Sequence, residues 1–215
     1  MRLYYFTGEQ FGLEALRDKR VKIARIDELN DPFDVVGHVV ADRKERIRFD
    51  RLRRQLHQMN GILCLSSNWC EPLPWGHYAD KHRGMCLGFD VSEESWKAVK
   101  YVSERSKVAY LAPLTDDLAD HLVLSKFKAW EYEREYRTIF DLQEMSPDPV
   151  NGHYFTGFSD RITLREVIVG HKCPVTRARL KSVLGEDAAS VEQKKARPAF
   201  RTFEVVEQRQ KRMWK

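Results

Sequence analysis

Apolar residues recur at regular spacing in several short stretches of the chain, and these stretches predict its secondary structure. A strand is expected at residues 2–6 and a second strand at 21–26. Between them, Phe11, Ala15 and Leu16 recur at the spacing of a helix that spans residues 8–20. The chain is therefore expected to open with the order strand, helix, strand.

The stretch NDPFD at residues 30–34 is a turn signal, because Asn-Asp before Pro favours turn initiation. We expect Asn30 and Asp31 to cap nearby backbone amides. Phe33 would then anchor the turn in the core.

The clearest helix of the sequence is predicted at residues 42–60, where one apolar stripe is surrounded by arginines. The stripe is formed by Phe49, Leu52, Leu56 and Met59. Further strands are expected at residues 61–67, 84–91, 135–140, 164–170 and 200–207. Further helices are expected at residues 115–130, with Thr115 as N-cap, and at 174–185, starting at Pro174 and closing on Gly185.

Short strands dominate this pattern, and the helices do not alternate with them regularly. This favours an α+β fold, a compact mixed domain of short strands with flanking helices. With 215 residues, 42% of them hydrophobic, the chain can build one sizeable core. We expect one domain over residues 1–185 and a basic C-terminal extension over 186–215 that ends in a strand packed on the same domain. Residues 185–200 are expected to form a loop.

Composition narrows the class of protein further. The chain has no apolar run long enough to cross a membrane and no signal-peptide pattern at its start, which predicts a cytoplasmic protein without a membrane partner. Its four cysteines are then expected to be reduced thiols. The net charge of +5 is a modest excess that is compatible with a polyanionic partner and does not require one. The oligomeric state cannot be read from these features.

The stretch KFKAWEYEREYRTIF at residues 126–140 carries the most suggestive chemistry. If extended backbone begins near Glu133, the side chains of Glu133, Glu135 and Arg137 share one face with Ile139, because residues two apart in a strand point to the same side. One interpretation is a surface ion-pair ladder. The other is a pair of carboxylates that holds a ribose hydroxyl and stabilises positive charge on the sugar while a glycosidic bond breaks.

The stretch WGHYADKHRGMCLGFD at residues 75–90 combines aromatic residues, histidines and a cysteine, with Gly84 and Gly88 allowing close backbone approach. A zinc site is disfavoured because the cysteines and histidines lack the tight pairs of structural zinc sites. Cysteine-histidine catalysis is disfavoured because none of the cysteines lies at an evident helix N-terminus. No metal is therefore expected, and Cys64 and Cys86 are expected to pack as small hydrophobic residues.

Basic residues interleaved with aromatic residues suggest a nucleic-acid track. On the helix at residues 42–60 the candidates are Arg51 and Arg54, which flank the apolar stripe. In the tail the candidates include Lys194 and Lys195, with Phe200, Phe203 and Trp214 available for base stacking. The alternative is a solvated helix face and an ordinary basic tail.

Four blocks in this order, NDPFD, LCLSSNW, WGHYADKHRGMCLGFD and KFKAWEYEREYR, followed by LREVIVG, resemble a widespread bacterial family of unknown function. Its signature is NDPF(E/D), WxxYAxxHxGxC and WxxExE followed by an aromatic residue and Arg. The block layout is similar to that of the ADP-ribosyltransferase-like superfamily, which includes DNA-modifying toxins. This resemblance implies an ADP-ribosyltransferase-like fold and NAD as the substrate.

The resemblance also implies roles for individual residues. Glu135 would be the catalytic glutamate with Glu133 as its partner, and Tyr78 would stack on nicotinamide. The remaining candidates for NAD binding are Tyr5, Ser66, Ser67, Trp75, His77 and Arg137. The first strand departs from the usual pattern, because it offers Tyr4, Tyr5 and Thr7, with Arg2 nearby, where such transferases place Arg or His.

Two hypotheses follow from the resemblance. The first is an enzyme that uses NAD to modify a nucleic acid or a protein, in a toxin or in antiphage defence. The second is a non-catalytic module that binds a nucleotide or a nucleic acid on the same scaffold.

Overall fold

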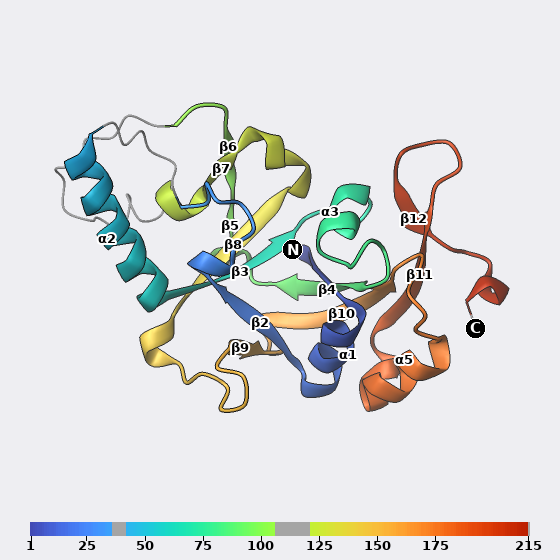
Figure 1. Ribbon diagram of the computed structural model, residues 1–215. Helices are drawn as coiled ribbons and strands as arrows, with labels where there is room; N and C mark the ends of the chain where they lie inside the picture. Colours follow the sequence, from blue (N-terminus) through green and yellow to red (C-terminus); the bar gives the residue numbers. More distant parts are fainter. Residues whose placement is uncertain (36–41, 106–120, 215) are drawn as a thin grey trace.

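The computed structural model describes residues 1–35, 42–105 and 121–214 (Figure 1). It shows a mixed α+β structure with an open sheet, as the pattern of short strands predicts. The strands are β1 (Arg2–Thr7), β2 (Arg20–Arg25), β3 (Asn60–Ser66), β4 (Met85–Val91), β5 (Lys97–Ala98), β6 (Lys100–Val102), β7 (Ser125–Phe127), β8 (Glu135–Asp141), β9 (Tyr154–Gly157), β10 (Ile162–Val169), β11 (Glu192–Pro198) and β12 (Val205–Glu207). The α-helices with described bounds are α1 (Glu9–Asp18), α2 (Arg43–Met59), α3 (Pro72–His77) and α5 (Arg177–Leu184).

Ten of these strands form one sheet that forks at β3. The main path runs β12-β11-β10-β4-β1-β3-β2-β9, and β8 pairs along the whole of β3 on its other edge. On the shared edge of β3, β1 pairs only at Ser66 and β2 pairs only at Gly61 and Ile62. Because β1 and β2 diverge from β3 between these points, the sheet opens there. This opening positions the candidate site.

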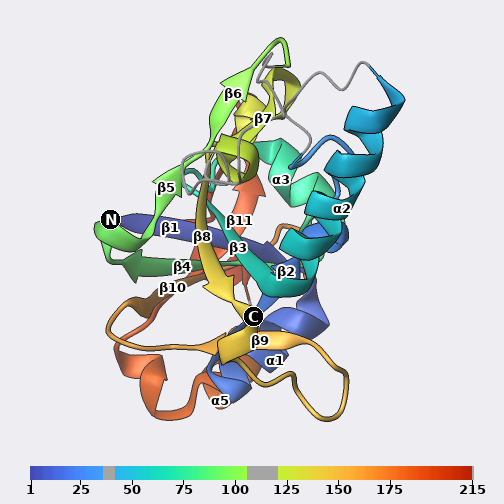
Figure 2. The ribbon, with the colours of Figure 1, turned by 90° about the vertical axis from the view of Figure 1, so that its left-hand side faces the viewer.

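Helices cover the β1–β4–β10 part of the sheet on both faces. On one face, α1 and α5 lie side by side (Figures 1 and 2) and pack on Leu3, Leu87 and Val167 in the largest apolar cluster. On the other face, Trp75 of α3 packs with Cys86 and Ile168. Helix α2 builds a separate cluster with Phe49 and Leu56. The core therefore lies around the central strands and reaches the fork through Leu63 and Leu65 of β3.

The expected helix at residues 42–60 is confirmed, and its start follows from a local hydrogen bond. The carboxylate of Asp42 accepts from the backbone N–H of Glu45 at 2.9 Å, as an N-cap does. Phe49 and Leu56 are buried as the stripe predicts, whereas Met59 is exposed. The helix at residues 174–185 is confirmed with a later start: Thr176 is its N-cap, so Pro174 precedes the helix.

Three expected elements differ from the structure. Residues 121–124 are helical, but the chain then forms β7, so the helix does not reach Trp130; Thr115 lies outside the described residues. Residues 192–198, expected as loop, form β11, which extends the sheet in parallel with β10. The expected strand at 200–207 is shortened to β12, because residues 199–204 form the connection between β11 and β12.

The turn at residues 30–34 is also built differently from the expectation. Asp31 does accept a hydrogen bond from the backbone N–H of Phe33 at 2.9 Å. The Phe33 side chain, however, is 53% exposed and lies under the guanidinium of Arg105, so the prediction that it anchors the core is wrong. The buried residues of this turn are Asp31 and Asp34, and both are acidic.

Within the described ranges, no helix combines the length and the apolar character needed to cross a membrane.

Candidate functional site

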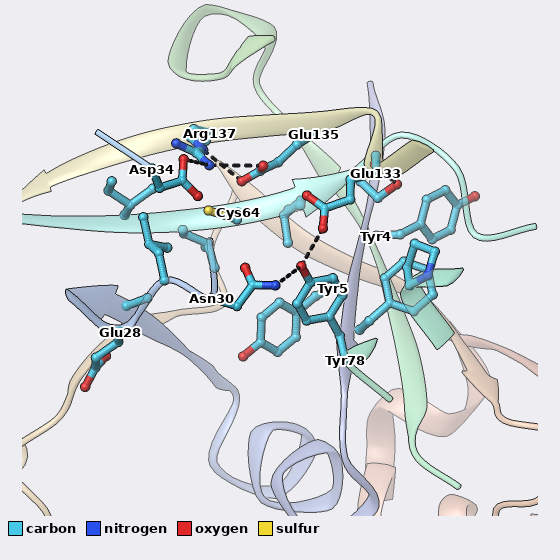
Figure 3. Close-up of a pocket in the computed structure, with 18 of the residues that line it drawn as sticks. Tyr4, Tyr5, Glu28, Asn30, Asp34, Cys64, Tyr78, Glu133, Glu135 and Arg137 are labelled. Carbon is cyan, nitrogen blue, oxygen red and sulfur yellow. Dashed lines mark hydrogen bonds and ion pairs between the residues drawn. The ribbon is translucent and has the colours of Figure 1, made fainter. Parts of the chain in front are cut away.

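A cavity of about 360 Å³ lies at the fork of the sheet, where β1 and β2 diverge from β3 (Figure 3). One side of its wall is apolar and aromatic, and the other side carries carboxylates with their cationic partners. The apolar and aromatic lining is formed by Tyr4, Tyr5, Phe6, Ala24, Leu29, Ile62, Leu63, Leu65, Pro74 and Tyr78. The polar lining includes Asn30, Asp34, Lys126, Glu133, Glu135 and Arg137.

Strand β8 supplies the deepest pair of charges. Glu135 and Arg137 point to the same side of this strand, as their two-residue spacing predicts. Arg137 Nε donates to Glu135 Oε1 at 2.8 Å, and Arg137 Nη2 donates to Glu135 Oε2 at 3.1 Å. Ile139, which was expected on the same face, is exposed away from this cavity and borders a separate hollow.

Glu133 reaches the same cavity by a different route from the one expected. It ends a 3₁₀ helix (Lys128–Glu133), and Arg134 then takes a left-handed conformation with φ 45° before the strand starts at Glu135. The Ser66 hydroxyl donates to the backbone oxygen of Glu133 at 2.6 Å. The kink and this hydrogen bond bring the Glu133 carboxylate back toward Glu135.

Lys126 of β7 joins the two carboxylates. Its Nζ lies 2.5 Å from Glu133 Oε2 and 2.8 Å from Glu135 Oε2, and it faces the ring of Trp130 at 5.2 Å. The sequence reasoning missed this residue, because it lies inside a segment that was expected to be helical. Its neighbours Ser125 and Phe127, with a second lysine at 128, give no local signal that would have singled it out.

Asp34 adds a third carboxylate from the turn at residues 30–34. Its Oδ1 accepts from Arg137 Nη2 at 2.9 Å. Its Oδ2 is buried without a hydrogen-bond partner among the described residues, and Lys126 Nζ is 3.9 Å away. The next residue, Val35, has φ 59°, which is strained for a β-branched side chain. A buried acceptor without a partner is costly, so its presence in the lining marks a place where a ligand donor would be stabilised.

These charges are buried, with Glu133 and Glu135 each 5% exposed and Arg137 1% exposed. The interpretation as a surface ladder is therefore wrong: the ion pairs exist, but they form an internal network. Three carboxylates face two cations, which leaves the network with an excess of negative charge.

The two glutamates differ in acidity. Burial alone would raise the pKa of Glu135, but Arg137 and Lys126 outweigh it and lower the pKa to about 2. For Glu133, burial raises the pKa, Lys126 opposes this shift, and the charge of Glu135 adds to it. Burial likewise raises the pKa of Asp34 against the attraction of Arg137 and Lys126. Glu135 is thus the carboxylate held ionised, and Glu133 is the one closer to accepting a proton.

Tyr78 links this network to the turn at residues 30–34. Its hydroxyl donates to Glu133 Oε1 and accepts from Asn30 Nδ2 at 2.7 Å (Figure 3). Asn30, which was expected to cap local amides, therefore orients the phenol. Burial and the charge of Glu133 raise the pKa of Tyr78, so the phenol stays protonated and donates at neutral pH.

The cavity mouth carries a further charged pair that was not predicted. Lys22 of β2 lines the cavity, and its Nζ lies 3.1 Å from Glu28 Oε2. Tyr5, a candidate from the sequence, also lines the cavity, and burial raises its pKa to about 12. Arg2 does not: it forms ion pairs with Asp90 and Glu166.

The stretch at residues 75–90 contributes mainly to the architecture. Trp75 is fully buried, donates to the Trp69 backbone oxygen and packs edge-on against Phe6, so it belongs to the core and not to the cavity lining. His77 is exposed beside Trp130 and Tyr132, outside the lining. Tyr78 is the member of this stretch whose hydroxyl reaches the charge network.

The glycines of this stretch have the close approaches that were expected. A Cβ at Gly84 would lie 2.0 Å from the Thr7 backbone oxygen, and a Cβ at Gly88 would lie 2.4 Å from Glu166 Cγ. Of the serine block, Ser66 lines the cavity, whereas Ser67 is exposed and bonds to the Arg134 backbone oxygen.

Among the described residues, histidine, cysteine and acidic side chains form no cluster that could hold a metal ion. The four cysteines are free thiols. Cys64 lines the cavity, and burial together with the charge of Glu135 raises its pKa well above the usual range, so it is not a thiolate.

The basic helix and the basic tail do not form one surface. Arg51 and Arg54 are exposed on α2, which lies at the opposite end of the molecule from the β11–β12 hairpin (Figure 1). Lys194 is paired with Glu166 and Glu192, and Lys195 donates to the Cys173 backbone oxygen. Trp214 is buried and is not available for base stacking, which corrects that part of the expectation.

Comparisons of the chain with protein-family models, with curated proteins and with solved structures found no match.

Proposed function

We propose that the cavity at the fork of the sheet binds NAD, and that the protein is an ADP-ribosyltransferase-like enzyme that transfers ADP-ribose to a nucleic acid or a protein. The observation that carries this proposal is the convergence of Glu133, Glu135 and Tyr78 at the end of an aromatic-lined cavity. The resemblance of the sequence blocks supplies the identity of the substrate. A role in a toxin or in antiphage defence is part of the same proposal.

The carboxylate pair suits the breaking of a bond between ribose and a leaving base. Environments that push the pKa values of two neighbouring acids apart separate their roles in catalysis. Glu135, held ionised, stabilises positive charge that develops on the ribose as the bond to nicotinamide breaks and its electron pair leaves with the nicotinamide nitrogen. Glu133, whose pKa is raised by burial, takes the proton of the acceptor group as that group bonds to the ribose.

Hydrogen bonding favours Glu133 as the glutamate that contacts the substrate. Both oxygens of Glu135 are occupied by the charged groups of Arg137 and Lys126. Among the described residues, Glu133 Oε1, in contrast, meets only the neutral phenol of Tyr78, so a ribose hydroxyl can share this oxygen. Glu135 then acts on the developing charge from its fixed place in the network.

Other features of the cavity fit the nicotinamide end of NAD. Tyr5 and Tyr78 offer flat apolar surface for the ring, and Asp34 Oδ2 offers a buried acceptor for its carboxamide N–H. The negative excess of the network suits the positive charge of the ring. About 360 Å³ lies near the lower end of the size of small-molecule sites, so we place the adenosine half outside the cavity and assign the phosphates to Lys22 of its lining.

The second candidate is a nucleotide-binding module without catalysis. It is favoured by one observation: in this structure the Glu133 and Glu135 carboxylate oxygens are already paired within the protein. Glutamates paired in this way also serve as a rigid recognition surface.

Calorimetric titration with NAD and chromatographic measurement of nicotinamide release separate these candidates. Release should be measured with the protein alone, with single-stranded DNA, with RNA and with a protein extract. Binding with release that is lost in Glu133→Gln supports the transferase. Binding without release under every condition supports the module. If NAD does not bind at about millimolar concentration, both the transferase and an NAD-binding module are overturned.

A further inference from the structure

The hairpin of β11 and β12 presents two phenylalanines that the fold does not use. Phe200 is 90% exposed and Phe203 is 99% exposed, both in the connection formed by residues 199–204. Fully burying such a side chain is worth roughly 1.5–3 kcal/mol, so this exposure forgoes a large stabilisation. Exposed apolar groups that are clustered in this way mark interaction sites more often than isolated ones do.

The hairpin is firmly held, so its tip is presented from a rigid base. The backbone N–H of Ala199 donates to the Glu204 oxygen at 2.8 Å, which closes the connection. Ala196 and Val205 are buried at the base in the cluster that contains Trp75. Figure 1 shows the hairpin extending beyond the sheet, at the end of the molecule opposite α2.

Arginines lie beside Phe200. The guanidinium of Arg197 lies over the Phe200 ring at 4.5 Å. A shallow hollow of about 380 Å³ beside the ring is lined by Arg197, Arg201 and Arg209, with Glu207 as its one acidic lining residue. Within the described part of the chain, Arg201 and Arg209 make no ion pair, so their charge is available to a partner.

We propose that this hairpin is a binding surface for single-stranded nucleic acid. Bases of a single strand have free faces that stack on aromatic rings, while guanidinium groups pair with the phosphates between them. Arg197 lies over the Phe200 ring, and Arg201 separates the two phenylalanines in the sequence. A duplex keeps its bases stacked inside, so it cannot use the phenylalanines in this way.

The position of the hairpin connects this surface to the cavity. The backbone N–H of Val205 donates to the Cys70 oxygen at 2.8 Å. Cys70 belongs to the connection that leaves the cavity at Ser66 and leads to α3, which precedes Tyr78. If the proposed transferase activity is correct, single-stranded nucleic acid is its acceptor class. Binding to the hairpin is measured without NAD, so its failure can be told apart from a failure of the proposed reaction.

The test is fluorescence anisotropy with labelled single-stranded DNA and RNA of about 20 nucleotides. Phe200→Ala with Phe203→Ala should weaken binding by about tenfold or more, because two stacking surfaces are lost. Arg201→Glu with Arg209→Glu should lower the salt slope by about 1.4 units, if each arginine contacts one phosphate. Since the four side chains are exposed or line an open hollow, circular dichroism and thermal melting should show unchanged folding.

The matched comparison is Arg51→Glu with Arg54→Glu on α2. A larger loss of affinity in this variant than in the hairpin variants would overturn the inference and support the helix as the nucleic-acid track. The absence of binding to either oligonucleotide at about 50 mM salt would also overturn it. If the protein binds vesicles of anionic phospholipid and no oligonucleotide, the inference is also overturned, because the hairpin would then be a membrane contact.

Discussion

Two buried glutamate networks in this protein use similar groups and differ in what they leave unsatisfied. Glu166 of β10 accepts from Arg2 at 2.8 Å, from the Tyr4 hydroxyl at 3.1 Å and from Lys194 at 2.8 Å. The cavity network likewise combines glutamates, an arginine, a lysine and a tyrosine hydroxyl.

Charge and access separate the two networks. The network around Glu166 has three carboxylates for three cations: Glu166, Asp90 and Glu192 are matched by Arg2, Arg165 and Lys194. The cavity network has three carboxylates for two cations, one carboxylate oxygen without a partner among the described residues, and an open space in front of it. A balanced network holds strands together, whereas an unbalanced network beside a cavity is prepared for a ligand.

Removing the arginine from each network should show the largest effect. Arg137→Met leaves Glu135 and Asp34 buried without their main cation, and we expect a loss of roughly 3–5 kcal/mol in the free energy of unfolding. Arg2→Met should cost less, about 1 kcal/mol, because Arg2 is partly exposed and Lys194 and Tyr4 still hold Glu166. Urea unfolding measures both values. Equal losses would mean that Arg137 stabilises its carboxylates no more than the partly exposed Arg2 stabilises Glu166.

Neutralising a glutamate in each network should separate catalysis from stability. Glu133→Gln should lower nicotinamide release about a hundredfold or more, because it removes the charge and the proton acceptor at nearly constant volume. Glu166→Gln should leave release unchanged and lower only the melting temperature. A Glu133→Gln variant with full activity would remove Glu133 from the proposed mechanism, and Glu135→Gln would then test its neighbour.

Acid should act on Glu135 in a defined window. Its pKa falls from about 4.5 in the unfolded chain to about 2 in the folded protein, so its charge stabilises the fold fully above pH 4.5 and loses this effect as the pH falls toward 2. Glu133 and Asp34 have raised pKa values and oppose this trend. We expect the stability difference between the parent protein and Glu135→Gln to be roughly 3 kcal/mol at pH 6 and to shrink below pH 4.5.

Urea titrations at several pH values test this window. A difference that stays constant from pH 6 to pH 3 would mean that the Glu135 charge does not contribute to stability. Glu166 has a lowered pKa as well, because Lys194 and Arg2 outweigh its burial, so Glu166→Gln should show the same direction.

Removing a tyrosine hydroxyl should give the smallest effects. Tyr78→Phe and Tyr4→Phe should each cost about 1 kcal/mol in stability, the value of one lost hydrogen bond. Only Tyr78→Phe should move the pH profile of nicotinamide release to higher pH, because the Tyr78 hydrogen bond lowers the pKa of Glu133. An identical profile in both variants would show that Tyr78 has only a structural role.

Local patterns predicted much of the secondary structure and part of the site. The apolar spacing located α1, α2, β3, β4 and β10 to within a few residues, because side chains on the buried face of an element must recur with its period. The same rule placed Glu135 and Arg137 on one face of a strand. Where a short charged or mixed stretch became a strand, as in β11, pattern alone failed, because pairing with β10 and not local propensity decides its conformation.

The sequence by itself determined the α+β class, the positions of the main elements, the placement of Glu135 and Arg137 on one face of a strand and the presence of aromatic and basic residues in the tail. Only the tertiary structure decided that Lys126 lies between the two glutamates, that Asp34 and not Phe33 is buried, and that the charges line a cavity. The physical reason is that these contacts join segments far apart in the chain, such as Asp34 and Arg137. Their geometry depends on the fork of β1 and β2 from β3, which no local spacing specifies.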